Sequence, residues 1–127
     1  MTQYFIIKLL ALAVCGFVLS ANAQKTTDKA VINTPTVQCD MCKGKIERYL
    51  KRADGVTAVN VDVKKKTTTV SWITDRTNIE NIKAQIANVG YDADDVAAVP
   101  EAYAKLPKCC KKPEDQGAKP AAVDEKQ

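Results

Sequence analysis

The chain contains no histidine among its 127 residues, and this absence removes several classes of site. Zinc sites built on imidazole, Ser-His-Asp hydrolysis and Cys-His proteolysis all require that side chain. The sequence also lacks the phosphate-binding P-loop, the dinucleotide-binding glycine fingerprint and the nucleophile elbow of hydrolases. We therefore expect that the protein is not an enzyme.

Aromatic residues are scarce, at 6% of the chain, and the formal net charge is only +4 at pH 7. A nucleic-acid-binding surface usually combines a strongly basic stripe with aromatic side chains on which bases stack. The sequence has no such stripe, so we expect no nucleic-acid partner.

Long apolar runs are missing except for residues 9–19, which are too few to span a bilayer as a stable helix. Lys8 precedes this run, and the small-residue tripeptide Ala-Asn-Ala follows it at positions 21–23. These features are typical of a secretory signal peptide over residues 1–23, with a retained anchor as the alternative. We therefore expect an exported protein, most simply a periplasmic one.

Two thiols three positions apart, Cys39 and Cys42, form the most informative motif of the sequence. Apolar residues follow them at helical spacing, at Ile46, Tyr49, Leu50 and Ala53. This pattern predicts Cys42 in the first turn of a helix and Cys39 in the loop before it. Free backbone N–H groups and the helix dipole favour thiolates at that position. Such a pair can bind one soft metal ion or close into a disulfide.

The rest of the chain alternates between strand and helix patterns. The expected elements are a strand over 30–37, the helix behind the thiols to about residue 53, strands over 59–63 and 69–72, a helix over 79–89 and a short strand over 91–96. Thr77 and Glu80 have the spacing of a capping box at the start of the second helix. This order predicts an α+β fold, a ferredoxin-like βαββαβ open-faced sandwich with four antiparallel strands.

These residues resemble the heavy-metal-associated domain family of copper chaperones, metal-exporting ATPase domains and the periplasmic mercuric-ion-binding protein. The resemblance rests on Cys39-x-x-Cys42 with Ile46 and Leu50 behind it, on Gly55-Val56 with Val59 and Val61, and on Val89-Gly90-Tyr91. It implies that Cys39 and Cys42 are metal ligands, and that Tyr91 and Met41 shield the site. The family often has Gly-Met-Thr before the first cysteine. Here Thr36-Val37-Gln38 stands instead, with Val37 expected to pack beneath the loop.

The expected layout of the chain has five parts. A signal peptide (1–23) and a flexible lead-in (24–29) precede the heavy-metal-associated domain (30–99). An extension with a Cys109-Cys110 pair (100–110) and a disordered tail (111–127) follow it. The vicinal pair adds sulfurs to the same ion or forms a second site, or else it is a disulfide or a pair of loose thiols. The first of these requires the chain to turn back toward Cys39 after residue 96.

Two thiolates without imidazole suit soft ions of low coordination number, such as Cu(I) and Hg(II). Zn(II) prefers four ligands, and it fits only if Cys109 and Cys110 join the site. We therefore expect a metallochaperone or scavenger that passes its ion by ligand exchange to a metal-transporting membrane protein or to another metallochaperone. Contact with a membrane would occur only through a transporter, and the protein would be a monomer or a metal-bridged dimer.

Two other functions use the same motif. The pair is also found at the helix start of thiol–disulfide redox proteins. The chain lacks the aromatic-Cys-Gly-Pro-Cys sequence typical of the thioredoxin arrangement. A non-binding interaction module with a structural Cys39–Cys42 disulfide is the second alternative.

Overall fold

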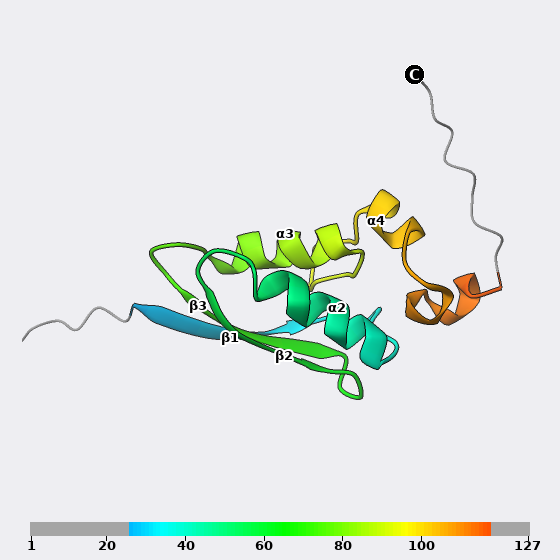
Figure 1. Ribbon diagram of the computed structural model, residues 1–127, viewed down its shortest axis with the longest axis horizontal. Helices are drawn as coiled ribbons and strands as arrows, with labels where there is room; N and C mark the ends of the chain where they lie inside the picture. The colour runs from blue at the N-terminus through cyan, green and yellow to red at the C-terminus, as the bar shows by residue number, and fades with distance from the viewer. Residues whose placement is uncertain (1–25, 118–127) are drawn as a thin grey trace, which may run out of the picture.

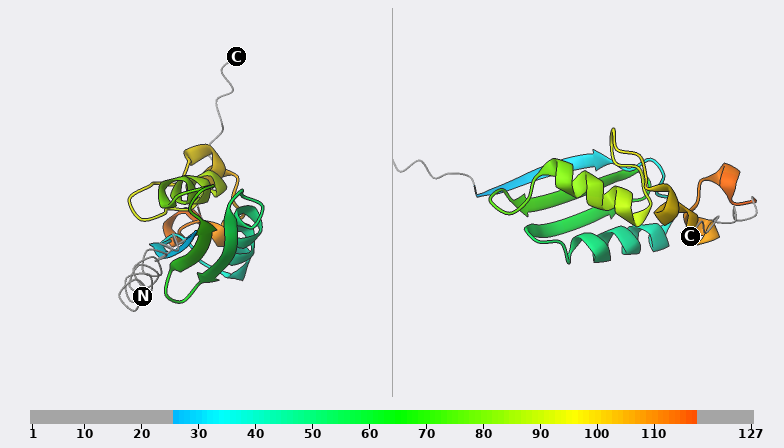
Figure 2. Two further views of the ribbon diagram at one scale, coloured as in Figure 1. Left: turned by 90° about the vertical axis from the view of Figure 1, so that its left-hand side faces the viewer. Right: turned by 90° about the horizontal axis from the view of Figure 1, so that it is seen from above.

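The computed structural model describes residues 26–117, which form one sheet with helices on one of its faces (Figure 1). The elements in chain order are β1 (Thr27–Asn33), α2 (Asp40–Leu50), β2 (Val56–Asp62), β3 (Thr67–Ile73), α3 (Ile79–Val89) and α4 (Pro100–Ala104), followed by two 3-10 turns, η1 (Lys108–Cys110) and η2 (Pro113–Asp115). The view from above shows α2 and α3 lying side by side over the strands (Figure 2). The predicted ferredoxin-like fold class is confirmed.

The sheet has three antiparallel strands in the order β1-β3-β2. Thr27 pairs with Ile73 at one end of β1 and Asn33 with Thr67 at the other. Strand residues that face the helices are buried, chiefly Ile32, Val61, Thr68, Val70 and Trp72. This alternation of buried and exposed side chains is the period of a half-buried strand, and it fixes which face carries the helices.

Both long helices bury one stripe of side chains against this face. In α2 the fully buried residues are Cys42, Ile46 and Leu50, which recur every four positions on one side of the helix. The helix ends at Leu50, one turn short of the predicted residue 53. Gly55 then takes the left-handed φ of 80° that leads the chain into β2.

The helix α3 begins at a different cap from the one that the sequence pattern suggested. Asn78 is the N-cap residue, and its side-chain oxygen accepts a hydrogen bond of 2.9 Å from the backbone N–H of Asn81. The predicted capping box of Thr77 and Glu80 is therefore wrong, and Glu80 instead pairs with Lys83 at 3.2 Å. Gly90 ends the helix with a left-handed φ of 107°, as its position predicted.

The predicted last strand over 91–96 does not form within the described residues. Ala93 and Val96 bridge to each other in a tight turn, in which Asp94 has a φ of 51°. This turn meets the end of β1 at Asn33, whose backbone N–H donates to the Asp94 carboxylate and whose carbonyl accepts from the Asp94 N–H, each at 2.8 Å. Asp94 and Asp95 also pair with Lys83 of α3, at 3.8 and 3.1 Å, so the turn is tied to both the sheet edge and the helix.

The extension packs on the end of the domain. The helix α4 starts at Pro100, as predicted, and Leu106 behind it joins the hydrophobic core with only 6% of its surface exposed. Part of the segment expected to be disordered, residues 111–117, has a defined conformation, because the Tyr103 hydroxyl donates a 2.6 Å hydrogen bond to Asp115. The rest of that segment and the predicted signal peptide lie outside the described residues. Within residues 26–117, none of the helices has the length and apolar content that a membrane crossing requires.

Candidate metal centre

The start of α2 brings the two predicted thiols together. Cys39 is the N-cap residue with an extended backbone, and Cys42 is the third residue of the helix, so the predicted placement of both is confirmed. Their Sγ atoms are 3.5 Å apart. Cys42 is fully buried whereas Cys39 is partly exposed, and neither forms a disulfide. One thiol of the pair therefore faces the core and the other faces solvent.

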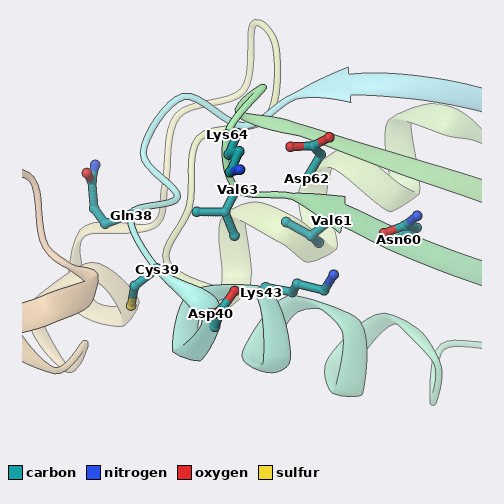
Figure 3. A pocket seen from close by; sticks show the side chains of 9 residues that line it. All are labelled: Gln38, Cys39, Asp40, Lys43, Asn60, Val61, Asp62, Val63 and Lys64. Atoms are coloured by element: carbon teal, nitrogen blue, oxygen red, sulfur yellow. The ribbon is translucent and has the colours of Figure 1, made fainter.

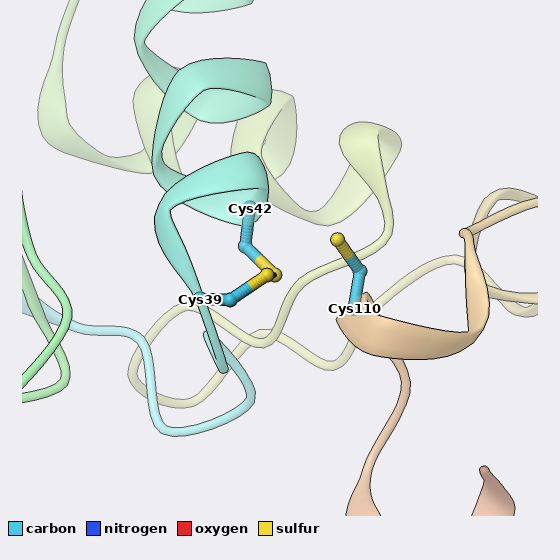
Figure 4. Close-up of side chains that lie close together, drawn as sticks. All are labelled: Cys39, Cys42 and Cys110. Carbon is cyan, nitrogen blue, oxygen red and sulfur yellow. Dashed lines mark hydrogen bonds between the residues drawn. The ribbon is translucent and has the colours of Figure 1, made fainter.

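A third thiol reaches the pair from the far end of the chain. Cys110 lies in η1, and its Sγ points toward Cys39 and Cys42 (Figure 4). The three Sγ atoms all lie within 4.8 Å of one another. The chain does turn back after residue 96, through α4 and Leu106, and this return is what sequence reasoning could not establish.

Cys109, by contrast, does not join the three thiols. Its side chain is exposed, and its Sγ lies 3.8 Å from the sulfur of Met41, which is 52% exposed. Its backbone carbonyl accepts a contact of 3.6 Å from the Cys39 thiol. The vicinal pair is thus divided, with Cys110 turned inward and Cys109 turned outward against Met41.

Tyr91 lies in the loop after α3 and is fully buried beneath the thiols. Its hydroxyl makes no well-formed hydrogen bond among the described residues, although it interacts with the thiols of Cys110 and Cys42. Burial raises the pKa of this phenol far above its usual range, and the neighbouring thiols of Cys110 and Cys42 raise it further. Tyr91 therefore presents a neutral O–H donor on the inner side of the cluster.

The three thiols differ in their electrostatic surroundings. Burial acts to raise the pKa of Cys39, but the backbone N–H of Cys42, its thiol and the backbone N–H of Met41 outweigh it, and the pKa lies below its ordinary value. Burial raises the pKa of Cys110, and the neighbouring Cys42 thiol adds to this rise. Cys39 is consequently the thiol that loses its proton more readily of these two.

The loop before Cys39 is held on both sides. The Thr34 backbone N–H donates to the carbonyl of Lys66 at 2.8 Å, and the Lys66 ammonium donates to the carbonyl of Val37. The Thr36 hydroxyl accepts a 3.0 Å bond from the backbone of Asp92, next to Tyr91. Val37 is fully buried and packs into the core, as expected from its place in the sequence. The two loops that carry the site are therefore fixed to each other.

An open groove of about 540 Å³ runs beside Cys39, between the start of α2 and the β2–β3 hairpin (Figure 3). Side chains of both charge signs line it, among them Asp40, Lys43, Asp62 and Lys64. Cys42 and Cys110 do not contribute to its walls. Cys39 is thus the residue of the cluster that borders this groove.

Sequence reasoning missed which member of the Cys109-Cys110 pair faces the site. The signal that was available is Leu106, an apolar residue in an otherwise polar segment, which anchors the extension in the core. With that anchor, the 3-10 turn over 108–110 places only every third side chain on the same side. Two adjacent cysteines must then point in different directions.

Comparisons with known proteins agree with this geometry. A model of the heavy-metal-associated domain matches residues 31–92. The chain is 36% identical over 62 residues to the copper chaperone CopZ of Staphylococcus haemolyticus (strain JCSC1435), across 49% of this chain and 91% of that protein. It is 27% identical over 84 residues to the mercuric transport protein periplasmic component of Shewanella putrefaciens, across 66% and 92% of the two chains.

A third relative is a copper-exporting P-type ATPase of the same staphylococcal strain. The two chains are 30% identical over 66 residues, which are 52% of this chain and 8% of the ATPase. Among solved structures, a CopZ metallochaperone superimposes with a TM-score of 0.50 at 26% identity, across 52% of this chain and 98% of that one. The match to the domain model ends at residue 92, before the extension that carries Cys110.

Proposed function

The chain belongs to the heavy-metal-associated domain family, and we propose that it is an exported carrier of a soft metal ion. The ion, Cu(I) or Hg(II), is held by the thiolates of Cys39 and Cys42 and passed on by ligand exchange. The observation that carries this proposal is the pair of free thiols 3.5 Å apart at a helix start, one buried and one partly exposed.

The donor set supports the choice of ion. Thiolates without imidazole or carboxylate neighbours prefer soft ions, and among the described residues the cluster contains sulfur donors only. The relatives include a protein named as a copper chaperone and one named as a mercuric transport protein. Copper and mercury are the two metals whose ions this chemistry favours.

Transfer follows from the unequal exposure of the two thiols. A thiolate of the partner enters through the groove beside Cys39 and forms a new bond to the ion. The bond between the ion and Cys39 then breaks, and Cys39 leaves as a thiolate that takes up a proton from water. Repetition at Cys42 completes the transfer, so the ion is bound to sulfur throughout and no electron is exchanged.

The partner in this scheme is another metal-binding protein with an accessible thiol pair. A copper-exporting ATPase is among the relatives, and its matching segment has the same domain type. A metal-transporting membrane protein or a second metallochaperone is therefore the expected receiver. The periplasmic name of the mercuric relative supports export, as does the signal-peptide pattern over 1–23.

The test is a competition titration of the reduced protein under anaerobic conditions with Cu(I), Hg(II) and Zn(II). Tight binding of a soft ion at one equivalent is expected, and Cys39→Ser/Cys42→Ser should abolish it. Cys109→Ser is the matched control, because that thiol lies outside the cluster, and it should bind normally. If no ion binds tightly while a Cys39–Cys42 disulfide exchanges rapidly with glutathione, the metal-carrier proposal is wrong and a redox function replaces it.

A further inference from the structure

We propose that Cys110 is a third ligand of the transported ion, so that the C-terminal extension completes a three-thiolate site with Cys39 and Cys42. This inference rests on the proposed function, since it concerns the same ion. It adds a ligand from outside the matched domain, which ends at residue 92. The sulfur positions, the anchoring of the extension and the hydroxyl of Tyr91 support this third ligand.

The sulfur positions suit three ligands better than two. Metal–sulfur bonds of about 2.3 Å require sulfurs about 4.6 Å apart for linear binding and about 4.0 Å apart for trigonal binding. Cys39 and Cys42 are 3.5 Å apart, and the three sulfurs all lie within 4.8 Å of one another. A trigonal ion requires these sulfur–sulfur distances to change by about 0.5 to 0.8 Å at most, whereas linear binding by Cys39 and Cys42 alone requires an increase of about 1.1 Å.

The extension holds Cys110 in place before any ion arrives. Leu106 is buried in the core, four residues before Cys110. The backbone of α4 packs directly on Gly90, where an added Cβ would lie 3.0 Å from the carbonyl carbon of Ala102. The Tyr103 hydroxyl also accepts a 2.9 Å hydrogen bond from the backbone of Lys112, beyond η1. The segment is therefore tied down on both sides of Cys110, which lowers the ordering cost of binding.

Tyr91 gives a second, independent indication of a ligand. Its hydroxyl is fully buried, makes no well-formed hydrogen bond among residues 26–117 and interacts with the thiols of Cys42 and Cys110. A buried donor without a partner costs free energy, and such groups are rare in folded proteins. When the ion displaces protons from the thiols, the O–H can donate to a thiolate sulfur. The unsatisfied group thus acquires a partner in the loaded protein.

Three thiolates also change what the site holds. A divalent soft ion neutralises more of the thiolates' charge than Cu(I) does. A site loaded with Hg(II) therefore keeps less net negative charge in a partly buried position than a site loaded with Cu(I). A partner that removes the ion has to displace Cys110 as well as the helix-start pair. The extension therefore strengthens retention, and its displacement becomes part of transfer.

The experiment is X-ray absorption spectroscopy on the full chain loaded with one equivalent of Hg(II), and separately of Cu(I). Wild type and Cys109→Ser should each show three sulfurs on the ion, and Cys110→Ser should show two. Competition titration should show a loss of affinity of about 10–100-fold for Cys110→Ser, because removing a ligand should cost at least as much as removing a group that only orients a ligand. Cys109→Ser should retain the wild-type affinity.

Two sulfurs in the wild type, with no change in Cys110→Ser, would overturn the third-ligand proposal and leave the carrier function intact. Failure of the carrier function itself has different signatures, which are no tight binding by the wild type or unchanged binding in Cys39→Ser/Cys42→Ser. If Cys110→Ser is unstable, the wild type and Cys109→Ser still decide: two sulfurs in the wild type overturn the proposal, and three sulfurs in both proteins support it, because Cys109 is then not the third ligand.

Discussion

Tyr91 has two roles that oppose each other in the metal-free protein. Its ring fills the core beneath the thiols, which favours the fold through burial of a large apolar surface. Its hydroxyl is buried without a partner, which opposes the fold. Only a change in the protonation of the neighbouring sulfurs gives that hydroxyl a strong acceptor.

This conflict predicts opposite effects of Tyr91→Phe in the two states. The variant keeps the ring and removes the unpaired hydroxyl, so the reduced metal-free protein should gain about 1 kcal/mol in free energy of unfolding. The loaded protein loses a hydrogen bond to a ligand sulfur, so its affinity for Hg(II) should fall about tenfold. Denaturant unfolding and competition titration measure the two quantities. A loss of stability in the metal-free state would show that the hydroxyl already has a partner there.

At the scale of elements, the junction of α3 and α4 decides where the third thiol lies. Gly90 is needed at this junction for two reasons: its φ is 107°, and the α4 backbone at Ala102 comes so close that a Cβ would have no room. Any side chain at this position meets both constraints at once. The position of η1, and of Cys110 in it, follows from where α4 sits.

Gly90→Ala should therefore destabilise the protein by about 1–3 kcal/mol and loosen the extension. Gly44→Ala is the matched control, because it lies inside α2 and a Cβ there meets nothing within 4 Å. That variant should be more stable by about 0.5–1 kcal/mol, through helix propensity. Unfolding midpoints give the stabilities, and the alkylation rate of Cys110, slow in the wild type, should rise in Gly90→Ala only. Equal effects of the two variants would contradict the close packing of α4.

The cap of α3 gives a second prediction at this scale. Asn78→Ala removes the side-chain acceptor for the Asn81 N–H and should cost about 1 kcal/mol of stability. Asn88→Ala makes the same chemical change at an exposed position late in the same helix and should be neutral or slightly stabilising. Thermal unfolding of the two variants distinguishes the cap from a general effect of asparagine. If Thr77→Ala costs more than Asn78→Ala, the capping box would be the correct description after all.

Periodicity correctly predicted the elements that bury one regular face, which are the strands of the sheet and the two helices packed on it. Both long helices and three strands follow from patterns such as Ile46 and Leu50 or Val70 and Trp72, since burial on one face leaves a regular trace in the sequence.

The bounds of the first strand were predicted wrongly, because β1 begins at Thr27, inside the expected flexible lead-in, and ends at Asn33 before residue 37. The last strand was predicted wrongly because the conformation of this segment is set by contacts with distant parts of the chain, the bonds of Asp94 to Asn33 and the pairs of Asp94 and Asp95 with Lys83. Local sequence does not contain those contacts.

The site was predictable to a similar extent and for similar reasons. Cys39 and Cys42 are neighbours in sequence, so helix geometry alone brings their sulfurs together. Cys110 approaches them through α4, Leu106 and η1, and each of those turns depends on packing against parts of the domain far away in the chain. The Thr77 cap failed because Asn78, one residue later, offers a side-chain oxygen in the same place.

On the scale of the whole molecule, the core is one cluster that joins the sheet, both long helices and the extension. It includes Ile32, Ile82, Leu106 and the thiols of Cys42 and Cys110. Because the candidate ligands belong to the core, binding an ion and folding draw on the same contacts. Occupancy of the site should therefore be visible in global stability.

Metal loading should raise the stability of the reduced protein by about 4 kcal/mol when the free ion is a thousand times its dissociation constant. Cys39→Ser/Cys42→Ser should show no such rise, and a chelator should reverse it in the wild type. The measurement is denaturant unfolding at a series of buffered free-ion concentrations. A rise of equal size in the double variant would place the stabilising ion elsewhere in the molecule.

The closeness of Cys42 and Cys110 has a mechanical consequence. An ion bonded to both sulfurs would cross-link the chain between residues 42 and 110, and everything from the second turn of α2 to η1 would lie inside the closed loop. A force that pulls on the two ends of the loaded protein would then pass through β1, the loop before Cys39 and the metal–sulfur bonds. The chain between the two sulfurs, with the β2–β3 hairpin and α3, would lie outside the covalent path of that tension, and force would reach it only through contacts such as the pairing of β1 with β3.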